Sequence, residues 1–145
     1  MAKTYFLIFS FCLTNLYSQN PLFIPEPLYG TEFNLNVQNG ATEFFPTINT
    51  PTYGVNGNIL GPTLFVDKWD WVTLHVTNNL TGTGNSTTMH WHGLHLPAVD
   101  DGGPHQLIEQ GDTWSPEFQI LNNAGTYWYH PHGAGKTDLQ VSRGI

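Results

Sequence analysis

The sequence has almost no cysteine. Among its 145 residues the one cysteine is Cys12, which lies within an apolar N-terminal stretch. A single cysteine excludes an intramolecular disulfide framework. It also leaves the rest of the chain without a thiolate ligand. A blue-copper centre, which needs a cysteine beside two histidines, therefore cannot be built by this chain alone.

Basic residues are scarce as well. The chain has 4 Lys and Arg residues against 11 Asp and Glu residues, for a formal net charge of −7. Such a surface argues against nucleic acids and anionic membranes as partners, because both attract positively charged proteins. It is compatible with attraction of metal cations or cationic substrates, although solubility is the preferred explanation.

The apolar run from Tyr5 to Leu13 is too short to cross a bilayer as a helix. Lys3 precedes the run and the small residue Ser18 follows it, which is the pattern of a secretory signal peptide. We therefore expect residues 1–18 to be a signal peptide and residues 19–145 to form one domain without a membrane span. The protein is then periplasmic or secreted. An apolar N-terminal strand is the alternative interpretation of the run.

Glycine and proline are plentiful, with 15 and 10 residues, and aromatic residues make up 14% of the chain. This composition is typical of short strands joined by tight turns. Alternating or β-rich segments predict strands at 32–38, 63–66, 72–76, 88–92, 114–120 and 126–130.

The connections between these strands carry their own signals. Asn39-Gly40 is expected to end the first strand, and residues 42–62 to form a looping connection. Pro116 is expected at a sheet edge or bulge, and residues 137–142 are expected to form one helical turn. Six to seven strands without a long helix predict an all-β, Greek-key sandwich or barrel.

Four of the seven histidines lie in two triplets, HWH at 90–92 and HPH at 130–132. In a strand, residues i and i+2 share a face, so each triplet directs two imidazoles the same way. If the two strands are neighbours, four nitrogen ligands converge on one metal-binding patch. Trp91 shares the opposite face with Met89, and we expect that apolar face to be buried.

Imidazole ligands alone do not identify the metal, since zinc, copper, iron and nickel all accept them. A catalytic zinc site needs three protein ligands and an open position, which His90, His92 and one histidine of the second triplet could supply. A cupin site also uses H-x-H but needs a Glu soon afterwards. The first acidic residue after His92 is Asp100, in a predicted loop. His75 stands alone on a polar strand face and is expected to be solvated.

Five segments of the chain resemble the first cupredoxin domain of a multicopper oxidase. They are LGPTLFV at 60–66, VTNNL at 76–80, TTMHWHGLHLP at 87–97, DGGPHQ at 101–106 and GTYWYHPHGAGKT at 125–137. The similarity covers nearly all of residues 19–145 and is greatest to bacterial laccases, cuprous oxidases and bilirubin-oxidase-like enzymes. It implies an N-terminal plastocyanin-like (cupredoxin) domain truncated at its C-terminal end, because relatives continue into a further strand.

The resemblance implies copper as the cofactor. By motif, His90 would bind the type 2 copper of a trinuclear cluster, His92 and His130 one type 3 copper, and His132 the other. In the family, the remaining four histidines and the cysteine-containing type 1 site come from the last cupredoxin domain. That domain, or a partner chain, would therefore have to complete the cluster.

In the family, the intact enzyme reduces O₂ to water with four electrons taken singly from phenols, related organic compounds or Cu(I). The implied activity is laccase-like oxidation of a small-molecule reductant, and this chain alone is expected to be inactive. A stand-alone copper-binding or delivery module and a mononuclear zinc site are the alternative functions.

Two further residues carry expectations. Asp101 would orient a ligand histidine or relay protons to it, and the alternative is a turn-forming Asp before Gly102. Trp69 stands where the family's turn usually has a glycine before Asp. A backbone conformation that favours glycine would be strained at a tryptophan.

Overall fold

The structure, a computed structural model, describes residue 22 and residues 24–82 and 85–145. The expected signal peptide at 1–18 lies outside the described residues. The elements, in chain order, are β1 (Leu28–Tyr29), β2 (Glu32–Phe45), β3 (Ile48–Val55), β4 (Leu64–Phe65), β5 (Trp71–Asn79), β6 (His90–His92), a 3₁₀ turn (Ala98–Asp100), β7 (Thr113–Trp114), β8 (Glu117–Gln119), β9 (Trp128–His130) and α1 (Thr137–Ser142). Within the described ranges no helix is long and apolar enough to cross a membrane.

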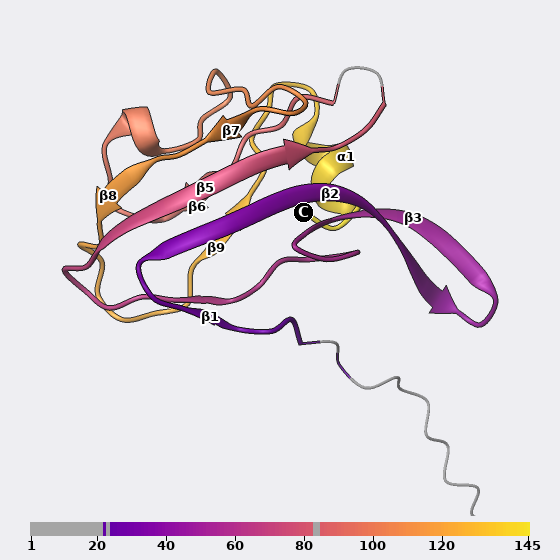
Figure 1. Ribbon diagram of the computed structural model, residues 1–145, viewed down its shortest axis with the longest axis horizontal. Coiled ribbons are helices and arrows are strands. Elements are labelled where there is room, and N and C mark those ends of the chain that lie inside the picture. The colour runs from indigo at the N-terminus through magenta and orange to yellow at the C-terminus, as the bar shows by residue number, and fades with distance from the viewer. Residues whose placement is uncertain (1–21, 23, 83–84) are drawn as a thin grey trace, which may run out of the picture.

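The largest sheet has the order β3-β2-β5-β7, and β8 also pairs with β5. Its two long central strands, β2 and β5, run parallel and side by side (Figure 1), with Phe33 opposite Leu74 and Leu35 opposite Val76. In each strand three apolar residues alternate with polar ones and lie in the core: Phe33, Leu35 and Val37 in β2, and Val72, Leu74 and Val76 in β5. This alternation is the period-two pattern that predicted the two strands.

The predicted strand at 114–120 is divided into β7 and β8, both antiparallel to β5. Pro116 lies in the gap between them, where it has no amide hydrogen to donate to the ladder. The expectation of a bulge or edge at this proline is therefore confirmed.

The β2–β3 hairpin differs from the sequence prediction. Strand β2 continues through Asn39-Gly40 to Phe45, and β3 occupies much of the predicted looping connection. Gly40 pairs with Thr52 within the ladder. A Cβ at Gly40 would lie 2.2 Å from the carbonyl oxygen of Asn58, so this glycine permits a close backbone approach rather than a turn. The chain reverses instead at residues 46–47, where Thr47 has a φ of 68°.

Strands β6 and β9 form a separate antiparallel pair. Met89 and Trp91 are 0% and 3% exposed, which confirms the predicted buried face of the first histidine triplet. The Trp91 ring packs against Trp114 and Phe118 of the large sheet, with ring centroids 6.4 and 6.2 Å apart. The core therefore lies between the β6–β9 pair and the large sheet, and the predicted all-β fold is confirmed.

Helix α1 occupies the predicted helical turn, and it is anchored by one buried side chain. Gln140 accepts a hydrogen bond from the Thr87 hydroxyl (3.0 Å) and donates one to the Ser86 carbonyl (3.1 Å). These two residues lead directly into the strand of the first histidine triplet. After the helix, Tyr53 donates its backbone N–H to Arg143 O at 2.8 Å.

Trp69 has a φ of 81°, so the expected glycine-favouring conformation is present at a tryptophan. Its amide donates to Ile120 O at 2.8 Å, and its carbonyl accepts from the Gln119 side chain at 3.0 Å. The indole itself is 62% exposed, with the Lys68 ammonium 4.9 Å from the ring centre. The turn is therefore held by its backbone contacts.

Candidate metal centre

The two histidine triplets are neighbours, because β6 pairs directly with β9. His90 lies opposite His130, and His92 lies opposite Trp128. His132 follows the end of β9, and its backbone N–H donates to the Thr88 hydroxyl at 2.6 Å. Thr88 is fully buried, so this contact fixes the chain where Pro131 interrupts the strand ladder.

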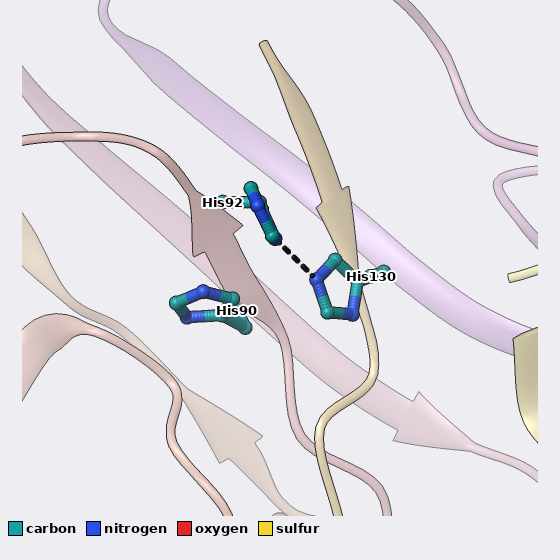
Figure 2. Close-up of side chains that lie close together, drawn as sticks. All are labelled: His90, His92 and His130. Atoms are coloured by element: carbon teal, nitrogen blue, oxygen red, sulfur yellow. Dashed lines mark hydrogen bonds between the residues drawn. The ribbon is translucent and has the colours of Figure 1, made fainter. Parts of the chain in front are cut away.

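Three of the four imidazoles converge closely. One ring nitrogen from each of His90, His92 and His130 lies within 4.8 Å of the other two. Nδ1 of His92 and Nε2 of His130 face one another at 3.1 Å (Figure 2). Imidazole nitrogens bind zinc at about 2.0–2.1 Å, so two adjacent ligands of one such ion lie about 2.9–3.4 Å apart. The separation of these two nitrogens therefore suits two ligands of one ion.

His132 lies beside this group without joining it. Its ring centre is 5.3 Å from that of His90 and 5.9 Å from that of His130. It is outside the set whose ligand atoms all lie within 4.8 Å. The fourth imidazole therefore lies next to the convergent group without being part of it.

Backbone carbonyls orient two of the rings. Nδ1 of His90 donates to the carbonyl of Asp101 at 2.7 Å, and Nδ1 of His130 donates to the carbonyl of Pro131 at 2.8 Å. Since a carbonyl can only accept, each Nδ1 carries the hydrogen and each neutral ring keeps its Nε2 lone pair. A histidine held in this way presents Nε2 as a metal ligand.

Asp101 contacts His90 through both its backbone and its side chain. Its carboxylate Oδ1 lies 3.2 Å from Nδ1 of His90, in addition to the carbonyl contact. Gly102 allows the loop to approach, because it has a φ of 69° and a Cβ there would lie 1.7 Å from the carbonyl oxygen of Met89. The sequence analysis selected Asp101 for its side chain. The backbone carbonyl contact with His90 could not be predicted, because every residue type has a backbone carbonyl.

The His130 side chain has a pKa below its ordinary value. The first cause is burial, since the residue is 6% exposed, and the second is repulsion from the neighbouring His90, His92 and His132 when they are protonated. The hydrogen bond to Pro131 opposes these effects. The ring is therefore kept neutral at lower pH than an ordinary histidine, which is the form that binds metal.

Trp128 is part of this centre and was given no role by the sequence argument. Its ring centre lies 4.1 Å from that of His130 and 5.0 Å from that of His92. The sequence feature that could have indicated this is the spacing of the two residues. Trp128 lies two residues before His130 and hence on the same strand face.

The remaining histidines lie apart from the cluster. His75 was expected to be solvated, but its ring contacts the Ser115 hydroxyl at 2.8 Å and a Glu32 carboxylate oxygen at 3.2 Å. His95 lines an open pocket of about 510 Å³ together with residues of β5 and β8.

Comparison with known proteins identifies the class. A family model described as multicopper oxidase matches residues 30–145. The multicopper oxidase mco of Staphylococcus aureus is 42% identical over 113 residues, which are 78% of this chain and 25% of that protein. The cell division protein FtsP of Escherichia coli is 35% identical over 130 residues, covering 88% of this chain and 27% of that protein.

A solved structure gives the same result for the fold. The laccase-like multicopper oxidase CueO from Ochrobactrum sp. superposes with a TM-score of 0.80 at 38% identity, covering 86% of this chain and 28% of that one. The chain belongs to the multicopper oxidase family and has a cupredoxin-like fold, as its motifs predicted. Membership implies copper, and the convergent imidazoles are suitable donors for it. The chain spans about a quarter of the length of the curated relatives it matches.

Proposed function

We propose that this chain is the copper-binding N-terminal domain of an exported multicopper oxidase. In this proposal His90, His92, His130 and His132 supply half of a trinuclear copper cluster. One observation carries it: Nδ1 of His92 and Nε2 of His130 lie 3.1 Å apart on paired strands, the spacing of two ligands on one ion. The proposed export rests on the apolar stretch near the N-terminus.

The assignment of ions is the one that the resemblance to multicopper oxidases implies. His92 and His130 share one type 3 copper, His90 presents Nε2 to the type 2 copper, and His132 binds the other type 3 copper. The hydrogen bonds from Nδ1 of His90 and His130 to carbonyl oxygens support this assignment, since they leave the opposite nitrogens free. Imidazole donors bind Cu²⁺ more tightly than the other divalent ions of the first transition row.

The intact enzyme would couple O₂ reduction to the oxidation of phenols, related organic compounds or Cu(I). Bound copper would supply the one-electron chemistry that reduces O₂ to water. This chain would hold and orient the ligands, and the Asp101 carboxylate would fix His90 or hold a proton close to it. The other ligands and the substrate-oxidising site would come from a C-terminal cupredoxin domain or a partner chain, so we expect no oxidase activity from this chain alone.

Metal binding tests this proposal. The metal-free protein would be titrated separately with Cu²⁺ and Zn²⁺ and followed by elemental analysis and electron paramagnetic resonance. We expect a copper signal with nitrogen coupling that is lost when the four cluster histidines are replaced by Ala. A matched variant lacking His75, His95 and His105 should keep the signal, because these residues lie outside the cluster.

Three results would contradict the proposal. The first is a protein that retains zinc and gives no copper signal after reconstitution, which indicates a mononuclear zinc site. The second is oxidation of a phenol by the isolated chain, which contradicts a half-site. The third is transfer of its copper to an acceptor protein without O₂ reduction by the assembled protein, which indicates a delivery module. One relative is named a cell division protein. Similarity to these proteins therefore does not establish oxidase activity without this test.

A further inference from the structure

Trp128 occupies an unusual position for a large aromatic residue. It is the cross-strand partner of His92 and lies on the same strand face as His130. Its indole is inclined by 27° to the His130 ring, with centres 4.1 Å apart, and by 32° to the His92 ring, with centres 5.0 Å apart. The indole is therefore stacked on the His130 ring and makes a tilted contact with the His92 ring.

The indole does not serve the apolar core. Trp128 is 53% exposed, whereas the core tryptophan Trp91 is 3% exposed. In the part of the chain that the structure describes, both ring contacts of Trp128 are with these two histidines. The packed side of the indole is therefore the side that faces the candidate ligands.

His92 needs such a neighbour more than His90 and His130 do. His90 is held by the carbonyl of Asp101 and His130 by that of Pro131. Among the described residues, the one hydrogen bond of the His92 ring is to His130, the residue with which it would share a metal ion. Rotation of an imidazole about its last side-chain torsion has broad minima, so a ring without another partner turns easily.

We propose that Trp128 is a positioning residue for His92. Packed against both His92 and His130, the indole holds the His92 ring so that Nδ1 faces Nε2 of His130. It thereby does for His92 what the carbonyl oxygens do for the other two rings. The inference rests on the proposed copper function and extends it to a residue that binds no metal itself.

Substitutions at Trp128 test this role. Trp128→Phe keeps an aromatic face, Trp128→Leu keeps apolar cover without stacking, and Trp128→Ala removes both. Trp71→Ala is the matched control, because it removes an indole that is 60% exposed on β5. Cu²⁺ affinity would be measured by competition with a chelator. In the metal-free protein, imidazole ¹⁵N–¹H spectra would report the contact between His92 and His130.

The Leu and Ala variants should weaken Cu²⁺ binding on the order of 10-fold or more, as loss of a ligand-orienting partner does. They should also lose the imidazole N–H signal of the His92–His130 contact. The Phe variant and the Trp71 control should keep that signal and stay within about 3-fold of the parent affinity. Circular dichroism would confirm that each variant folds.

Wild-type affinity in the Leu variant would overturn the inference, because apolar cover alone would then suffice. So would an imidazole signal that survives in the Ala variant. If the parent chain binds no copper, the proposed function fails, but the metal-free spectra still decide whether Trp128 orients His92. The two failures are therefore distinguishable.

Discussion

His130 is the buried member of the histidine cluster, while His92 and His132 are exposed. Burial and the neighbouring imidazoles lower its pKa, so protonation costs more in the folded chain than in the unfolded chain. An unfolded histidine titrates near about 6.5. The stability of the metal-free protein is therefore fully present above this pH and declines below it, because the unfolded state then binds more protons.

We predict that the midpoint of thermal unfolding of the metal-free protein falls as the pH is lowered from 7.5 to 5.5. A His130→Gln variant should fall less over the same range, because Gln does not titrate. Scanning calorimetry in buffers of equal ionic strength measures both curves. A midpoint that rises on acidification, or parallel curves for the two proteins, would contradict the prediction.

Gly102 gives a second prediction at a single residue. In Gly102→Ala the new Cβ would meet the Met89 carbonyl, and relief of this overlap would move the Asp101 loop away from His90. We expect a loss of about 2–4 kcal/mol in the free energy of unfolding, from the left-handed backbone and the overlap together. Gly111→Ala is the control, since Gly111 has a φ of 89° but open space around its Cβ. Equal losses in both variants would show that the overlap is unimportant.

The sequence predicted the convergence of His90, His92 and His130 better than the contacts that orient their rings. Spacing alone placed two imidazoles on each strand face, and the chemistry of imidazole indicated a metal. The ring orientations depend on the carbonyls of Asp101 and Pro131, which any residue type can provide. Trp128 had the correct parity, but parity does not say which rings stack.

The turn before β5 stores strain in its backbone. Trp69 adopts a left-handed conformation that costs a non-glycine residue on the order of 1 kcal/mol or more. We predict that Trp69→Gly raises the free energy of unfolding by about 1 kcal/mol in urea titrations, with an unchanged m-value. Trp69→Ala keeps the strain and removes the ring, so it should not be stabilised. If Trp69→Ala were also stabilised, the rise in the free energy of unfolding would come from loss of the exposed indole instead.

The short helix α1 is predicted to depend on one residue. Gln140→Leu would leave the Ser86 carbonyl without its side-chain donor, and the buried Thr87 hydroxyl would keep only its hydrogen bond to the Thr88 carbonyl. We expect a loss of about 1–3 kcal/mol of stability in chemical denaturation, the penalty for unpaired buried polar groups. Leu139→Gln, at a neighbouring position that is 49% exposed, is the control and should change little. Equal effects of the two changes would argue against the anchoring role.

Strands were predicted correctly where apolar and polar residues alternate regularly. The prediction failed at a glycine, because glycine can serve either a turn or a close approach between two backbones. The apolar alternation in β2 and β5 marks buried faces directly. Asn39-Gly40 has the chemistry of a turn, yet Gly40 serves a close approach to Asn58 that depends on distant residues. Pro51 lies in the segment that was predicted to be a looping connection, but β3 is at the sheet edge, where a missing amide hydrogen is tolerated.

For the whole molecule, copper binding is predicted to stabilise the fold. A ligand that binds only the folded state adds about 2.7 kcal/mol at 100 times its dissociation constant. Cu²⁺ should therefore raise the unfolding midpoint, and a chelator should reverse the rise. The variant lacking His75, His95 and His105 should respond like the parent, and the variant lacking the four cluster histidines should not. A rise in the latter would indicate binding elsewhere.

The overall topology was only partly predictable. Composition and turn spacing indicated a sandwich or barrel, but the parallel pairing of β2 with β5 joins segments whose partnership has no local signal. Family resemblance supplied the cupredoxin-like arrangement that the physical argument left open between a sandwich and a barrel.

The contacts of residues 143–145 constrain how the domain can fold during synthesis. Tyr53 N–H donates to Arg143 O, and Leu60 N–H donates to Gly144 O at 2.7 Å. Arg143 and Tyr53 also join their side chains across 90 residues of chain. A ribosome releases β3 long before these partners emerge, because synthesis proceeds from the N-terminus. Tyr53 of β3 and Leu60 can therefore make these hydrogen bonds only after Gly144 has left the ribosome.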